Sequence, residues 1–143
     1  MVWGAIARGR KFPLIKITGT LDARAYIEQI LANFVPQLPR ATRKRPVFMQ
    51  DGASCHTAFL HQNNVQVLPD WPNNSPDLNP IENLWGYIEN RLKNRVCRSY
   101  DELWCDIRQK WNNVPMCLID SLINRWFLGL LTTSVHINSL YKY

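Results

Sequence analysis

The sequence lacks the patterns that mark several large classes of protein. Its four cysteines form no C-x-x-C pair and show no metal-ligand spacing, so we expect reduced thiols in an intracellular protein. No apolar run reaches the roughly 18 residues that a membrane span needs, and we expect no membrane partner. The N-terminus lacks the order of basic, apolar and small-residue regions of a signal peptide. No internal repeat or low-complexity segment is present, which leaves a globular domain.

Acidic residues are also in short supply. The chain has 11 Asp and Glu against 17 Lys and Arg, which gives a net charge of +6 over 143 residues. A basic balance of this kind favours a polyanionic partner such as nucleic acid, although it carries no information on the fold. The length is sufficient for one domain with a substantial core.

The first half of the chain alternates strand and helix patterns. "VWGAIA" and "LIKIT" are joined by a basic, glycine-containing turn and predict a hairpin. A helix begins after the N-cap residue Asp22 and ends before Pro36. The other predicted elements are strands at 47–49 and 65–68 and a short helix at 57–63. This order predicts an α/β fold, a mixed sheet with helices packed on it.

The second half of the chain shows helical patterns. One apolar stripe has the spacing of a helix that begins near residue 79, and Ser99 with Glu102 fits a capping box before a second helix. A third stripe begins near residue 119. We therefore expect one domain over 1–143, with strands and a crossover helix in about 1–70 and C-terminal helices in about 79–133.

Asp51 is the first candidate for chemistry. It follows the short apolar strand "VFM" and precedes Gly52. In open α/β sheets, ligands bind outside the carboxyl ends of the strands, so an acid there is well placed for a metal ion. Because Asp-Gly is also a common turn pair, the alternative is a turn residue without a chemical role.

Glu82 is the second candidate, and it also has two interpretations. With Asn79 as N-cap and Pro80 as the first helical residue, Glu82 takes the third position, where an acid caps the helix and complements its dipole. Paired with Asp51 across the intervening strand, it would instead supply a second carboxylate to Mg²⁺. Two-metal sites of this kind catalyse phosphoryl transfer. One carboxylate cannot serve the cap and the metal together.

Other residues could support such a site. His56, five residues after Asp51, and Asn79 could hold a ligand or a phosphate in position, or simply begin their helices. Two basic groups could contact phosphates, and the first could also serve as a nuclear address; a solvated surface is the alternative for both. The candidates for nucleic-acid binding are Arg43, Lys44 and Arg45 in the first group and Arg91 and Lys93, followed by Arg95 and Arg98, in the second.

The strings "QDGASCHTA" and "WPNNSPDLNPIENLWGYIENRL" resemble the catalytic domain of the mariner superfamily of cut-and-paste DNA transposases. The opening "MVWG" and the closing "YKY" extend the resemblance over nearly the whole chain. It implies a ribonuclease-H-like fold with an Asp-Asp-Glu triad, in which Asp51 is the second acid and Glu82 the third. It further implies two Mg²⁺ or Mn²⁺ ions, DNA ends and target DNA as partners, a possible homo-oligomer, and a place in the nucleus.

The chain departs from that family pattern in two places. The first Asp of the family lies on a strand upstream of the "VWG" string, so we expect a partial fold in which this strand is missing and a sheet edge is left open, with poor solubility or self-association. The stretch between Asp51 and Glu82 is shortened around "TAFLHQNNVQ". We therefore expect an inactive chain. The alternative is a non-catalytic DNA-binding or interaction remnant of a decayed transposon.

Overall fold

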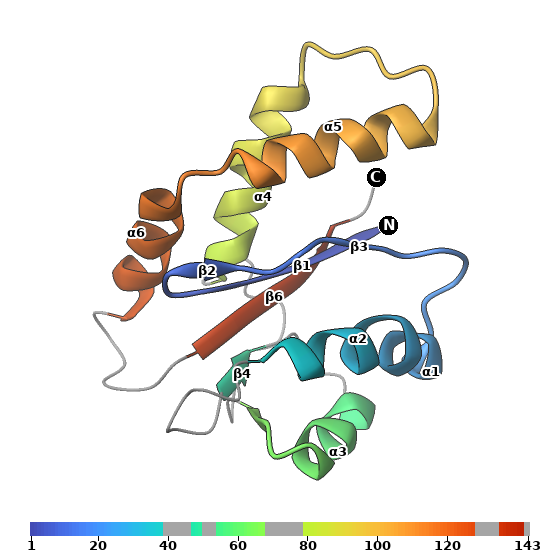
Figure 1. Cartoon of the computed structure of the whole chain (residues 1–143), viewed down its shortest axis with the longest axis vertical. Coiled ribbons are helices and arrows are strands. Elements are labelled where there is room, and N and C mark those ends of the chain that lie inside the picture. The colour runs from blue at the N-terminus through green and yellow to red at the C-terminus, as the bar shows by residue number, and fades with distance from the viewer. Residues whose placement is uncertain (39–46, 50–53, 68–78, 128–134, 142–143) are drawn as a thin grey trace.

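A computed structural model describes residues 1–38, 47–49, 54–67, 79–127 and 135–141, with the backbone alone at 54–56, 126–127 and 135–141. One mixed sheet lies between two layers of helices (Figure 1). The expected α/β fold is confirmed. The strands are β1 (Val2–Ala7), β2 (Arg10–Lys11), β3 (Ile15–Lys16), β4 (Val47–Met49), β5 (Gln66–Val67) and β6 (Val135–Tyr141).

The last strand of the chain lies in the middle of the sheet. The strand order is β2-β1-β6-β4-β5, with β3 also paired to β1. β6 runs antiparallel to β1, with Gly4 opposite Ser139, and parallel to β4, with Val47 opposite Val135. The two halves of the sheet are therefore joined through β6.

This position of β6 corrects two expectations. Residues 135–141 form a strand, whereas we expected the chain to end in helices. The expected open edge is also wrong, because β1 pairs with β2 and β3 on one side and with β6 on the other. The physical reason is visible in "VHINSLY", where Val135 and Ile137 alternate with polar residues as in a strand.

The lower helical layer covers one face of the sheet. It contains α1 (Ala23–Tyr26), a π-helical segment (Ile27–Leu31), α2 (Ala32–Phe34), a 3-10 turn (Val35–Gln37) and α3 (Ser54–Gln62). Asp22 is the N-cap as predicted, and its Oδ1 accepts a hydrogen bond from Ala25 N at 2.7 Å. The helical path includes Pro36 rather than ending before it, because a proline is tolerated at the first positions of the new 3-10 turn.

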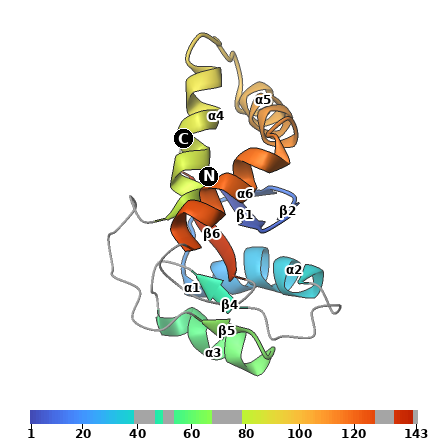
Figure 2. The same cartoon turned by 90° about the vertical axis from the view of Figure 1, so that its left-hand side faces the viewer.

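The upper layer consists of α4 (Pro80–Leu92), α5 (Tyr100–Asn112) and α6 (Met116–Phe127), which Figure 2 shows from the side. α4 packs against β6, α5 and α6. The predicted apolar stripe of α4 is buried as expected: Ile81, Leu84, Trp85, Ile88 and Leu92. No helix in the described part of the chain has the length and apolar character to cross a membrane.

A close approach of two tryptophans explains one glycine of β1. The rings of Trp85 and Trp111 stack with centroids 5.3 Å apart above the sheet. A Cβ added to Gly4 would lie 3.0 Å from Leu14 and Trp111 and 3.1 Å from Trp85, so any larger residue would require these side chains to move.

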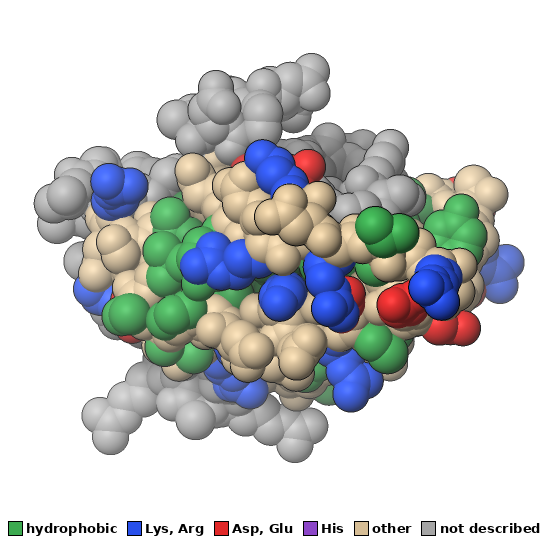
Figure 3. Space-filling view, turned by 90° about the horizontal axis from the view of Figure 1, so that it is seen from above, with side chains coloured by type: hydrophobic (Ala, Val, Ile, Leu, Met, Phe, Trp, Pro, Cys, Tyr) green, Lys and Arg blue, Asp and Glu red, His purple; other side chains and the backbone are tan. Residues whose placement is uncertain are grey.

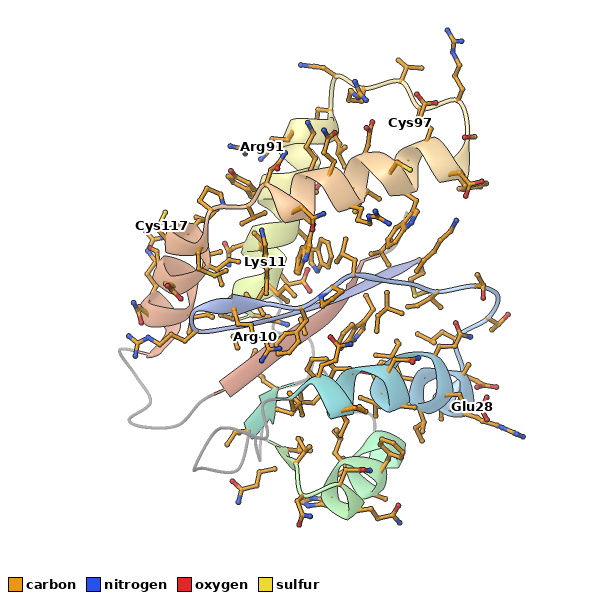
Figure 4. The ribbon with its side chains drawn as sticks, in the orientation of Figure 1. Arg10, Lys11, Glu28, Arg91, Cys97 and Cys117 are labelled. Carbon is orange, nitrogen blue, oxygen red and sulfur yellow. The ribbon has the colours of Figure 1, made fainter. Side chains whose placement is uncertain are left out.

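Lys11 connects the hairpin to the end of α5. Its Nζ donates to the carbonyl oxygens of Trp111, Asn112 and Val114 at 2.9, 2.5 and 2.9 Å (Figure 4). Partial burial of this ammonium group lowers the pKa of Lys11. Trp111 Nε1 donates to the Phe12 carbonyl at 2.9 Å. These bonds fix the upper layer on the sheet and so fix the position of α4.

Candidate functional site

The start of α4 is a capped helix terminus. Asn79 is the N-cap, as predicted, with an extended backbone, and its Oδ1 accepts from Ile81 N at 3.3 Å. Pro80 occupies the first helical position, where its missing N–H is not needed. The Asn79 carbonyl accepts from Glu82 N at 3.0 Å. Because Asn79 is buried, at 1% exposure, this hydrogen-bonded arrangement fixes the first turn and the backbone of Glu82.

Glu82 lies in that first turn with a half-buried side chain. Its helix packs on β6, and β6 pairs with β4, the strand that leads toward Asp51. Helix α4, which carries Glu82, therefore packs on β6, the neighbour of strand β4 that precedes Asp51. Asp51 itself lies outside the described residues, so their separation remains a prediction.

The remaining predicted residues have different outcomes. Arg43, Lys44 and Arg45 lie outside the described residues. The backbone of His56 lies in α3, but its side chain is not described. Within the described part of the chain, no three His, Cys, Asp or Glu side chains form a cluster that could hold a metal ion.

The donor chemistry of Glu82 fits a hard divalent cation. Mg²⁺ and Mn²⁺ prefer carboxylate oxygens and retain several waters, so a small number of protein carboxylates is compatible with such an ion. Glu82 is half-buried in the first turn of a capped helix, so its backbone is held in place. Of the two predicted acids, Glu82 is the one that the structure describes, and its carboxylate is of a kind that could hold such an ion.

Arg91 and Lys93 lie at the opposite end of α4. The Arg91 guanidinium carbon lies 3.4 Å from the centroid of the Tyr87 ring, and NH1 donates to the Tyr87 carbonyl at 3.3 Å. Lys93 is the exposed C-cap. Figure 3 shows Lys and Arg side chains spread across the upper face of the molecule. A positive surface of this kind is compatible with a phosphate backbone.

Arg95 has a structural partner instead. Its Nε and NH2 donate to the two carboxylate oxygens of the buried Asp106, at 2.8 and 2.7 Å. These hydrogen bonds hold the pKa of Asp106 below its usual range, and burial opposes the shift. Cys97 lies beside the pair, and burial, together with the Asp106 charge, raises the pKa of its thiol. Arg95, a member of the second basic group, therefore forms a structural ion pair and is not a candidate for binding phosphate.

A groove that the sequence did not predict lies between α4 and α6. Its volume is about 550 Å³, and Glu82 is among the residues that line it. We call it the α4–α6 groove; the other lining residues are Asn83, Gly86, Tyr87 and Asn90 of α4 and Leu118 and Leu122 of α6. A glycine in the middle of an otherwise strong helix pattern was the one sequence signal that could have indicated it.

Comparison with known proteins identifies a family. Residues 1–104 match a family model described as DDE superfamily endonuclease. The chain is 35% identical over 129 residues to the transposase of transposable element Tcb1 from Caenorhabditis briggsae, and 32% identical over 129 residues to the Tc1 transposase from Caenorhabditis elegans. These matches cover 86% and 87% of the chain but 46% and 47% of the relatives, so the chain spans about half the length of these proteins.

Solved structures give the same fold. The chain is similar to the Mos1 transposase catalytic domain solved with raltegravir and Mg, with a TM-score of 0.65 and 24% sequence identity. This similarity covers 79% of the chain and 61% of the solved domain. A second structure of that domain, solved with raltegravir and Mn, has a TM-score of 0.66 at 24% identity. The expected ribonuclease-H-like architecture is therefore confirmed.

Proposed function

The chain belongs to the DDE superfamily endonucleases, with a catalytic domain of the mariner type, and from that premise we propose that it is part of a metal-dependent enzyme that cleaves and joins DNA strands. Asp51 and Glu82 are the proposed metal-binding carboxylates. Mg²⁺ or Mn²⁺ would activate water or a DNA hydroxyl and stabilise the leaving oxygen. The proposed place of action is the nucleus, where the DNA lies.

The position of Glu82 is the observation that carries this proposal. The residue lies within the region matched to the family, in the first turn of a helix packed on β6 beside β4. The Asn79 cap fixes that turn, so Glu82 would orient an ion against a phosphate without first ordering its own backbone. Preorganisation of this kind is a large part of catalysis, because a misplacement of about 1 Å costs roughly 100-fold in rate.

We further propose that residues 1–143 alone do not turn over substrate. Only Asp51 and Glu82 match acids of the family triad, and two carboxylates are few for a two-metal site. A longer form that adds an upstream strand with a third acid is expected to nick supercoiled plasmid DNA in Mg²⁺ or Mn²⁺. Glu82→Gln in that form should abolish nicking, whereas Glu89→Gln, an exposed acid on the same helix, should not.

A longer form that folds but never nicks DNA in either metal would contradict this proposal. It would indicate that the shortened stretch between Asp51 and Glu82 has separated the two acids. Nicking that survives Glu82→Gln at the wild-type rate would contradict the assignment of Glu82.

The net charge of +6 and the basic upper face favour a second candidate, a DNA-binding or interaction module without catalysis. Under this alternative the chain binds duplex DNA without any divalent ion, and the affinity falls as salt rises because condensed counterions are released. Asp51→Asn and Glu82→Gln would leave that affinity unchanged. Binding that requires Mn²⁺ and either acid would favour the catalytic assignment instead.

A further inference from the structure

Gly86 is a glycine that packing does not explain. It lies in the middle of α4, where glycine is the least favourable residue after proline. A Cβ added to Gly86 would meet no heavy atom within 4 Å, whereas one added to Gly4 would meet two tryptophan rings. The missing side chain therefore creates open space rather than a close contact.

That open space is the middle of the α4–α6 groove. Gly86 lies on the face of α4 opposite its buried stripe, one helical turn from both Glu82 and Asn90. The groove volume of about 550 Å³ is within the range of pockets that bind small ligands. A Cβ at position 86 would meet no other atom, so we expect a larger side chain there to extend into the groove.

The groove offers three kinds of contact to a ligand. Asn83 and Asn90 carry amides that both donate and accept hydrogen bonds. Leu118 and Leu122 supply an apolar surface. Tyr87 also lines the groove, and the Arg91 guanidinium covers one face of its ring. A flat ring with polar edges matches this combination, because its faces stack on apolar and aromatic groups while its edges bond to amides.

The positive charge of Arg91 beside the groove favours flat ligands that carry a negative group. The Arg91 guanidinium lies over the Tyr87 ring, and Arg91 projects from α4 on the side of α6 (Figure 4). A positive group beside a ring-binding groove fits a base that carries a phosphate, and the chain as a whole has a net charge of +6. Glu82, at the other end of the groove, is the residue proposed above to hold a cation.

We propose that the α4–α6 groove binds an unpaired base of a DNA strand, with an adjoining phosphate on the side of Arg91. This inference rests on the proposed function and deepens it, since it makes Gly86 and the groove amides positioning residues for the strand. A paired base keeps its edges and faces inside the duplex. The groove therefore distinguishes unpaired DNA from duplex DNA.

Fluorescence anisotropy of the 143-residue chain tests the proposal. The probes are one labelled single-stranded oligonucleotide and the same sequence as a blunt duplex, without divalent ions. Gly86→Leu should weaken binding to the single strand roughly tenfold, because a base stack in such a site is worth about that factor, and should leave duplex binding unchanged. Gly86→Ala should have a smaller effect of the same kind. Asn90→Leu, which removes an exposed amide of the groove, should also weaken binding to the single strand and leave duplex binding unchanged.

Gln109→Leu is the matched control, because it adds a leucine to an exposed position of α5 away from the groove. It should change neither affinity. Equal affinity of Gly86→Leu and wild type for the single strand would overturn the proposal, as would an equal loss for both DNA forms. If Gly86→Leu changed a dimer to a monomer in sedimentation and left DNA binding intact, the proposal would be wrong, and the groove would be an interface between two copies of the chain.

Failure of the inference and failure of the proposed function have separate readouts. The proposed base-binding groove is contradicted if the Gly86 variants bind the single strand as tightly as wild type does without metal. The proposed function fails on metal binding and nicking of the Glu82 variants. Each result can occur without the other.

Discussion

Arg95 and Asp106 form a two-point ion pair, with donor–acceptor distances of 2.8 and 2.7 Å, that connects the loop after α4 to the middle of α5. Asp106 is 6% exposed as a residue, whereas the Arg95 side chain is 55% exposed. The carboxylate therefore depends on Arg95 for its hydrogen bonds. Loss of Arg95 would leave a buried acid without its main partner, which is more damaging than loss of a surface pair.

We predict that Arg95→Ala lowers the melting temperature by several degrees, and that the effect depends on pH. The folded-state pKa of Asp106 is depressed below its ordinary value of 3.8, so the pair stabilises the protein above that value and the contribution is lost as pH falls through the depressed pKa. Thermal denaturation of both proteins at a series of pH values from 7 down to 2 measures this. The difference between wild type and Arg95→Ala should shrink below pH 3.8.

Asp101 provides the control. It pairs with Lys16 at 2.8 Å, but its side chain is 87% exposed, and surface pairs contribute little. Asp101→Asn should therefore change stability far less than Arg95→Ala at neutral pH. Equal effects of the two substitutions would contradict the structural role given to the Arg95–Asp106 pair.

Two glycines should respond to alanine in opposite directions. Gly4→Ala places a Cβ 3.0 Å from Trp111 and should lower the free energy of unfolding by about 1–3 kcal/mol, since a packed core tolerates an extra methyl poorly. Gly86→Ala meets nothing and should raise it by up to about 1 kcal/mol through helix propensity. Urea denaturation of both variants gives the signs. Destabilisation by Gly86→Ala would show that the glycine has a packing role after all.

Cys97 should be the slowest to alkylate of the three cysteines whose side chains are described. Burial and the Asp106 charge raise its thiol pKa, which lowers the fraction of reactive thiolate, whereas Cys105 and Cys117 are exposed. Mass spectrometry of iodoacetamide labelling at pH 8 gives the three rates. Asp106→Asn should accelerate Cys97 and leave Cys117 unchanged; no change at Cys97 would contradict the assigned cause.

The central strand β6 should be essential for the fold. Ile137 lies opposite Ile6 on one side and Met49 on the other, so its backbone is within both ladders. Ile137→Pro removes a backbone N–H from the middle of the sheet and should abolish the cooperative thermal transition. Ile137→Val keeps the N–H and should fold. A cooperative transition in the proline variant would show that the sheet does not need β6.

Much of the fold was predictable because its signals are local. The apolar stripe of α4, the Asp22 cap and the Asn79–Pro80 helix start all depend on residues within one or two turns. β6 was missed because a strand at the centre of a mixed sheet depends on partners far away in the sequence, here residues 2–6 and 47–49.

The candidate site divides in the same way. The position of Glu82 in the first turn of α4 followed from "NPIEN" and is confirmed as a position. The α4–α6 groove was not predicted, because Gly86 becomes the middle of a groove only when α6 packs beside α4. The meeting of Asp51 and Glu82 stays a prediction, since it depends on residues outside the described part of the chain.

A Mn²⁺ titration monitored by electron paramagnetic resonance tests most directly whether Asp51 and Glu82 form one metal site. Wild type, Asp51→Asn, Glu82→Gln and the control Glu89→Gln are compared at one pH and one salt concentration. We expect a bound Mn²⁺ signal in wild type and Glu89→Gln, and a loss of at least about tenfold in affinity in each of the other two variants. Equal Mn²⁺ binding by wild type and Glu82→Gln would contradict the claim that Glu82 and Asp51 form one metal site.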